Sequence, residues 1–111
     1  MIHELRHYVP LPGKNQAMID RFKVHVIPVF KKLNVKMLDF WVTEDESDGF
    51  WYVLEWPDAE TGKETLAGIA DSPDWQKVKA LTEKDGPLIH KIESRFCRRP
   101  NWVAPAYRTT P

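Results

Sequence analysis

Hydrophobic and polar residues alternate along residues 2–9, and this period of two predicts a strand. Between residues 14 and 33, apolar side chains recur at steps of three and four, which indicates an amphipathic helix. Pro28 interrupts this helix and removes one backbone hydrogen bond, so we expect a kink there. Two β-prone runs, residues 35–44 and 50–56, flank an Asp-Gly pair typical of a hairpin.

The second half of the chain continues with helix and strand signals. Residues 58–71 predict a weak helix, because two glycines lower its helix propensity. Ser72 followed by Pro73 predicts the start of another helical segment, and an Asp-Gly-Pro turn ends it. Residues 88–98 predict the last strand. The order predicts an α+β, ferredoxin-like βαββαβ fold with a four-stranded antiparallel sheet.

The central hairpin is apolar on both of its faces. The helices can cover only one face of a four-stranded sheet, and leaving a Trp-sized side chain in water forgoes on the order of 2 kcal/mol. We therefore expect a homodimer, a dimeric α/β barrel whose two sheets enclose a shared cavity. The alternative is that residues 101–111, expected as an extended C-terminal tail after a domain of residues 1–100, cover the open face.

Composition narrows the classes of function. Sixteen Lys+Arg balance sixteen Asp+Glu among 111 residues, which argues against nucleic acid and against an anionic membrane surface as partners. Cys97 is the one cysteine, so no internal disulfide forms, and the four histidines lack the spacing of a zinc site. No apolar run is long enough for a membrane span, and the charged N-terminus is unlike a signal peptide. The sequence predicts a cytoplasmic protein with no metal and no cofactor.

Candidate chemistry gathers on the first strand. Glu4, Arg6 and Tyr8 share one face, and because Leu5 and Val9 suit the helix side, we expect the three to line the dimer cavity. A carboxylate, a guanidinium and a phenol around an apolar pocket can bind and polarise a small oxygenated molecule. The alternative is a structural Glu–Arg ion pair capped by the tyrosine, since buried charges usually pair.

His25, at the edge of the apolar stripe of the first helix, joins Tyr8 and Arg6 as a candidate catalytic residue, as a general base. The alternative for His25 is a core-edge histidine bonded to the backbone. The remaining candidate ligand-binding residues, expected to border the same cavity with Glu4, are Met37, Asp39, Trp41, Trp51 and Glu55.

Several short segments, in a fixed order along the chain, resemble the NIPSNAP family of the dimeric α/β-barrel superfamily. They are residues 4–8 (ELRHY) with 12–14 (PGK), 21–22 (RF) with His25 and Pro28, 40–41 (FW), 71–75 (DSPDW), and 85–88 (DGPL) before 92–94 (IES). The resemblance covers roughly residues 1–100 and implies a ferredoxin-like subunit and a sheet-to-sheet dimer. Relatives in the wider superfamily include cofactor-free monooxygenases and isomerases. The family often has an arginine early in the helix after the third strand, where this chain has Lys63.

Three functions remain open. The first is a homodimer that binds a small organic molecule between its two sheets. The second is an enzyme on the same cavity, a cofactor-independent monooxygenase or isomerase. The third is a protein-interaction scaffold that uses the aromatic tail, with Trp102 and Tyr107. We favour a small-molecule function because apolar groups on both faces of the sheet indicate a cavity more clearly than a recruiting surface.

Overall fold

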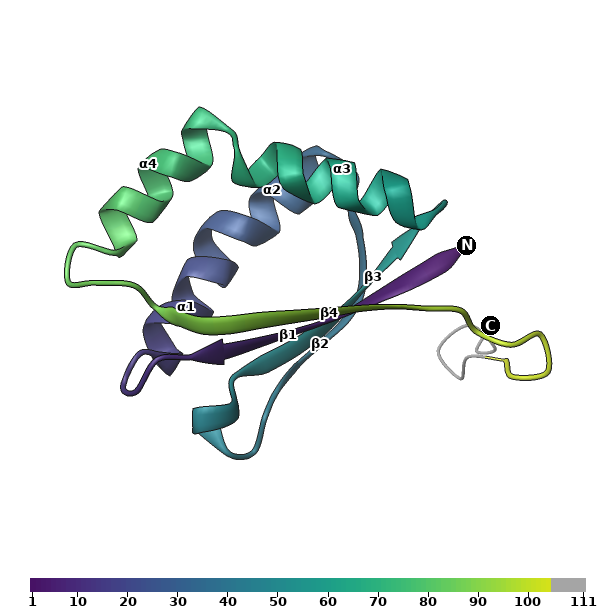
Figure 1. Cartoon of the computed structure of the whole chain (residues 1–111), viewed down its shortest axis with the longest axis horizontal. Coiled ribbons are helices and arrows are strands. Elements are labelled where there is room, and N and C mark those ends of the chain that lie inside the picture. Colours follow the sequence, from purple (N-terminus) through teal and green to yellow (C-terminus); the bar gives the residue numbers. More distant parts are fainter. Residues whose placement is uncertain (105–111) are drawn as a thin grey trace.

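A computed structural model describes residues 1–104 of the chain. Its elements are β1 (Ile2–Pro10), α1 (Asn15–Arg21), a π-helical turn (Phe22–Val26), α2 (Ile27–Lys32), β2 (Lys36–Val42), a 3₁₀ turn (Glu46–Asp48), β3 (Phe50–Trp56), α3 (Ala59–Ala70), α4 (Pro73–Thr82) and β4 (Ile89–Cys97). All helices of this part lie on one side of the sheet (Figure 1). Of the predicted tail, residues 105–111, with Tyr107, lie outside the described residues.

The four strands are arranged in the order β2-β3-β1-β4, and every neighbouring pair is antiparallel. This confirms the predicted α+β, ferredoxin-like fold. In the register of β1 with β3, Glu4, Arg6 and Tyr8 lie opposite Leu54, Tyr52 and Phe50 in that order. Since side chains on paired residues share a face, these residues of β1 lie on the same face as the apolar residues of β3.

The first helix runs from residue 15 to residue 32 with one irregular turn. The backbone N–H of Ile27 donates to the carbonyl of Phe22, five residues back, and Pro28 follows in the first turn of α2. A proline cannot donate to the carbonyl four residues earlier and crowds it, and a wider turn relieves both effects. The irregularity expected at Pro28 is thus a π-helical turn placed just before it.

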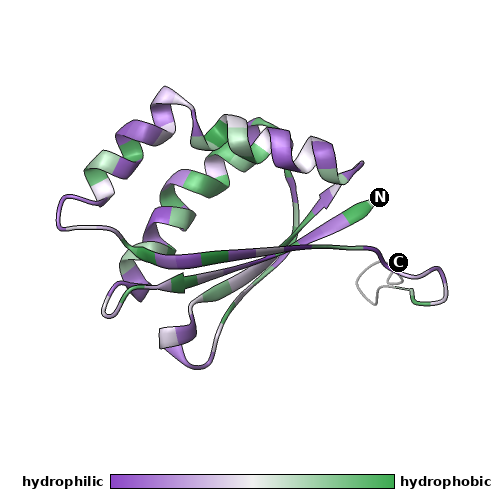
Figure 2. Cartoon of the chain, viewed as in Figure 1, coloured by the Kyte–Doolittle hydropathy of each residue, from purple (hydrophilic) through white to green (hydrophobic). Residues whose placement is uncertain are grey.

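The core lies between the helices and the sheet and is rich in aromatic rings. Phe22 of the π-helical turn is 3% exposed, and its ring centroid is 5.2 Å from that of Phe50 and 4.8 Å from that of Tyr52. Phe30 of α2 meets Phe22 edge-on. Hydrophobic and hydrophilic residues are interleaved along the helices, as expected when one side faces this core (Figure 2).

Helices α3 and α4 both begin at a capping side chain, and Ser72 is the cap that the sequence predicts for α4. The side chain of Ser72 accepts a hydrogen bond from the backbone N–H of Trp75, which caps α4. Asp58 caps α3 in the same way, through the N–H of Thr61. Within residues 1–104, no helix is both long and apolar enough to cross a membrane.

No helix of the described part lies over the second face of the sheet (Figure 1), and the strand register places aromatic residues on it. Trp41 of β2 lies opposite Trp51 of β3, and the Trp41 side chain is 48% exposed. His7 of β1 stacks on Trp51 with ring centroids 3.9 Å apart, and its Nε2 lies 2.6 Å from the carbonyl oxygen of Asp48. We call this the open face.

Gly62 tests the contact between α3 and the sheet. A Cβ at Gly62 would lie 2.7 Å from Nε1 of the buried Trp56, whereas a Cβ at Gly68 of the same helix would meet nothing within 4 Å. We expect Gly62→Ala to lower the free energy of unfolding by about 1–3 kcal/mol through overpacking. Gly68→Ala is expected to raise it by about 0.5–1 kcal/mol through helix propensity. Urea unfolding measures both, and a stabilising Gly62→Ala would contradict this packing.

Candidate functional site

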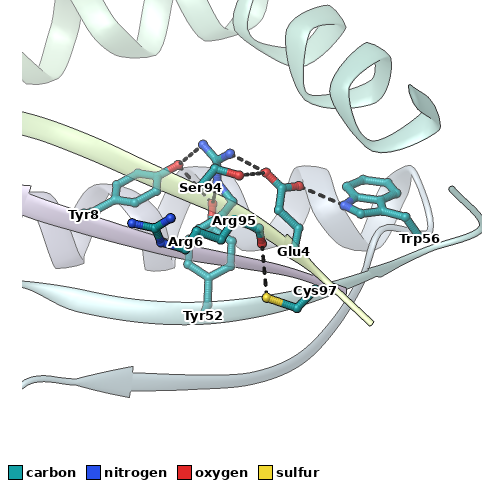
Figure 3. A network of polar contacts seen from close by, with 8 residues as sticks. All are labelled: Glu4, Arg6, Tyr8, Tyr52, Trp56, Ser94, Arg95 and Cys97. Atoms are coloured by element: carbon teal, nitrogen blue, oxygen red, sulfur yellow. Dashed lines mark hydrogen bonds and ion pairs between the residues drawn. The ribbon is translucent and has the colours of Figure 1, made fainter. Parts of the chain in front are cut away.

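A buried carboxylate lies at the centre of the polar contacts between sheet and helices. Glu4 of β1 is 2% exposed and accepts three hydrogen bonds (Figure 3). Its Oε2 accepts from Arg6 Nη1 at 2.7 Å and from Ser94 Oγ at 2.6 Å. Its Oε1 accepts from Trp56 Nε1 at 2.9 Å. The donors come from β1, β4 and β3, so three strands together satisfy one negative charge.

Arg6 connects this carboxylate to two phenols. Its Nε donates to Tyr52 Oη at 2.9 Å and its Nη2 to Tyr8 Oη at 3.2 Å, while the two phenol oxygens lie 2.9 Å apart. Burial opposes the charge of Arg6, but Tyr52, Tyr8 and Glu4 together raise its pKa above its usual value, so the guanidinium stays charged. Burial raises the pKa of Tyr52 well above its usual value, and Tyr52 stays a neutral phenol.

A cavity of about 570 Å³ lies between the sheet and the helices, and the polar side chains that the sheet contributes to its lining are Arg6, Tyr8 and Tyr52. Most of its remaining lining is apolar and comes from the helices and β4. Representative apolar lining residues are Val29, Phe30, Leu66, Ile69 and Ile92. Small-molecule sites combine this kind of apolar wall with a few polar groups, in volumes of about 300–1,000 Å³.

Two further side chains of the first helix reach this cavity. His25 in the π-helical turn lines it, and no residue in the described part of the chain forms a hydrogen bond with its ring. The backbone-bonded alternative for His25 is therefore absent from residues 1–104. Arg21 is 6% exposed, pairs with Glu83 at 2.7 Å and lies over the ring of Trp75. Helical periodicity alone predicts that Arg21 is exposed. In the structure it is buried, because Trp75 and Thr82 of α4 and the following Glu83 cover it.

The predicted facing of β1 is wrong. We expected Glu4, Arg6 and Tyr8 to line the open face, and the structure places them on the helix side. The expectation rested on Leu5 and Val9, which suit the helix side. Inside the core, however, Tyr52 and Trp56 supply hydrogen bonds for Arg6 and Glu4. In the structure, Glu4 and Arg6 form an ion pair with Tyr8 beside it, and Arg6 and Tyr8 also border a cavity on the helix side.

The other predicted ligand-binding residues lie apart from this cavity. Met37 packs against the core, because a bulge between Met37 and Asp39 shifts the register of β2. Asp39, Trp41, Trp51 and Glu55 lie on the open face, as their pairing with β3 and β1 shows. Glu55 there is within 3.3 Å of both His3 and Lys36. In the part of the chain described, no three His, Cys, Asp or Glu side chains group as metal ligands.

Comparison with known proteins decides the family. The NIPSNAP family model matches residues 3–104, which is nearly the whole chain and includes every residue of the cavity. The chain belongs to the NIPSNAP family. No curated protein matches this NIPSNAP chain significantly in sequence.

Solved structures share the fold of this NIPSNAP chain at low sequence identity. A NIPSNAP-like domain protein from Burkholderia xenovorans is 16% identical, with a TM-score of 0.75 over 94% of this chain and 89% of that one. A NIPSNAP family protein from Agrobacterium tumefaciens is 17% identical, with a TM-score of 0.73 over 91% and 94%. An antibiotic biosynthesis monooxygenase is 12% identical, with a TM-score of 0.60 over 90% and 99%. These identities carry the fold alone.

Glu4→Gln tests whether the buried pair is needed for folding. The substitution keeps the shape of the side chain but removes the counter-charge of Arg6 and turns an amide N–H₂ toward a donor. We expect the free energy of unfolding to fall by about 3 kcal/mol. Asp20→Asn, at an exposed carboxylate on α1 that within residues 1–104 is hydrogen-bonded only to Gln16, is the control and is expected to change stability little. Equal losses in the two variants, measured by urea unfolding, would show that the Glu4 pair is dispensable.

Proposed function

We propose that this NIPSNAP protein binds a small organic molecule in the cavity between its helices and its sheet. The observation that carries the proposal is the cavity itself, about 570 Å³ with mainly apolar lining. Arg6, Tyr8 and Tyr52 give this lining a polar part able to orient a ligand, while the apolar lining provides the hydrophobic contribution to affinity.

This proposal moves the ligand from the space between two sheets to the helix side of one chain. The reason is that Arg6, Tyr8 and His25, the candidate catalytic residues, line that cavity together. Arg6, Tyr8 and Tyr52 are hydrogen-bonded to one another before a ligand arrives, so binding needs little ordering of these side chains.

A second candidate is a cofactor-independent monooxygenase or isomerase on the same cavity. Two observations favour it, the likeness in fold to an antibiotic biosynthesis monooxygenase and the ring of His25, which has no partner within residues 1–104. A free imidazole beside a ligand can act as a general base. His25→Gln separates the candidates, since turnover is lost in an enzyme while ligand affinity is kept in a binding protein.

The open face supports the proposal of a homodimer with the sheets face to face. Trp41 is half exposed next to Trp51, and a second sheet laid against this face would remove both indoles from water. The same face carries three cationic and three anionic side chains, so a second copy related by a twofold axis can meet it without net repulsion. They are Lys36, Lys91, Arg95, Asp39, Glu55 and Glu93.

Val29→Phe tests the cavity as a ligand site. Val29 lines it, so the larger ring fills part of the volume, whereas Val24 on the same helix lies outside the lining and is 59% exposed. We expect Val29→Phe to weaken binding of the apolar dye Nile red at least tenfold, and Val24→Phe to leave it unchanged. Fluorescence titration measures both. Equal affinity of the two variants would place the dye elsewhere and contradict the proposal.

Trp41→Lys tests the dimer. The wild type is expected at twice the chain mass of 13.0 kDa in light scattering after size exclusion. A lysine at Trp41 places a charge in the proposed contact and removes its largest exposed apolar group, so we expect a monomer at the same concentration. Leu81→Lys is the control, because Leu81 lies exposed on α4, on the helix side, and the dimer should persist. A monomeric wild type would overturn the proposal.

A further inference from the structure

The contacts among Arg6, Tyr8 and Tyr52 leave one of the two phenol protons without an acceptor. Arg6 donates to both phenol oxygens, and the oxygens share one hydrogen bond at 2.9 Å. Two phenols carry two protons, so one bond between them leaves one proton without an acceptor among residues 1–104. Tyr52 is 1% exposed, whereas Tyr8 is only partly buried and lines the cavity. The satisfied arrangement has Tyr52 donating to Tyr8, and Tyr8 donating into the cavity.

The neighbouring groups add further donors. The hydrogen bonds of Arg6 use three of its five N–H groups. Glu4, the strongest acceptor nearby, already takes three donors, is 2% exposed and is absent from the cavity lining. A ligand that reaches this part of the cavity therefore meets unused donors, and an acceptor atom on the ligand is the group that satisfies them.

The charges favour a neutral acceptor over an anion. The positive charge of Arg6 is balanced by Glu4 at 2.7 Å, and that of Arg21 by Glu83 at 2.7 Å. The other charged groups of the lining are one cation, Lys32, and two anions, Glu64 and Asp74. Lys32 is exposed to solvent, and the cation beside Tyr8, Arg6, is already paired, so a carboxylate next to Tyr8 would lose its hydration without gaining a free counter-charge, whereas a carbonyl loses much less.

The lining nearest to Tyr8 is aromatic. The ring of Tyr8 stacks on Phe50 at 4.9 Å and meets Phe22 edge-on at 6.3 Å, and all three rings line the cavity. Further rings in the lining are those of Phe30, Tyr52 and Trp75. Ring edges and faces of this kind pack well against another flat ring.

From these contacts we infer that the ligand is an aromatic ketone or a similar neutral carbonyl compound, whose oxygen accepts the hydroxyl proton of Tyr8. The inference rests on the proposed function, because it assumes that the cavity holds a ligand. It adds the chemical class of that ligand, the donor that recognises it, and the prediction that anions of the same shape are rejected.

The test uses three probes with one naphthalene body and the full-length protein. They are 2-acetylnaphthalene, which has a carbonyl, 2-naphthoate, which has a carboxylate, and 2-isopropylnaphthalene, which has neither. Equilibrium dialysis gives the affinity of each probe for the wild type. We expect the ketone to bind at least fivefold more tightly than either of the others, which is the effect of one hydrogen bond worth about 1 kcal/mol.

Two variants assign the effect to Tyr8. Tyr8→Phe keeps the ring and removes the hydroxyl, so it is expected to lower the affinity for the ketone about fivefold. Its affinity for 2-isopropylnaphthalene is expected to stay unchanged, which also shows that the cavity is intact. Ser47→Ala is the control, because it removes an exposed hydroxyl that lies outside the cavity lining, so the ketone keeps its advantage. In the infrared, the ketone carbonyl stretch is expected at lower wavenumber in the wild type than in Tyr8→Phe.

The failures of the two proposals are distinguishable. If all three probes bind with equal affinity and Tyr8→Phe changes nothing, the cavity binds ligands and the inference on their class is overturned. Tightest binding of 2-naphthoate overturns it as well, since an anion is then preferred. If none of the three probes binds the wild type, the proposed function fails, and the inference fails with it.

Discussion

The hydrogen-bonded carboxylate of Glu4 is the interaction on which the rest of the structure depends. A negative charge in a protein core is tolerated only when its partners surround it, and the partners of Glu4 come from three strands. They require β1 to turn this face toward the helices, because a slip of one residue would move Glu4 to the open face. The same contact holds the indole of Trp56 against Gly62, which positions α3 on the sheet.

This network also explains why stability and a candidate site coincide. Arg6 is held by Glu4 on one side and by two phenols on the other, so its orientation toward the cavity is set by the folding of the sheet. A site built on a strand and supported by buried partners is more rigid than one on a loop. The structural ion pair and the cavity are parts of one arrangement, and the charge of Arg6 is already balanced before any ligand arrives.

The first helix, which borders the cavity, contains an irregular turn between α1 and α2. The π-helical turn before Pro28 carries His25 into the lining, where its ring has no partner within the described residues. Short π-helical turns are frequent at functional sites, because they rotate side chains away from the positions of a regular helix. The family match extends over this turn, the cavity and the strands. The π-helical turn and the His25 ring, which has no hydrogen-bond partner among the described residues, thus lie together at the cavity.

The order of elements, the break before Pro28 and the start of α4 at Ser72 were determined by the sequence itself, because periodicity, prolines and caps act over a few neighbouring residues. The face of β1 was decided only by the tertiary structure. Leu5 is more hydrophobic than Glu4, so the local pattern favours the wrong face. The donors that make Glu4 stable in the core, on Trp56 and Ser94, lie 52 and 90 residues away in the chain. Only the folded sheet brings them within hydrogen-bond distance.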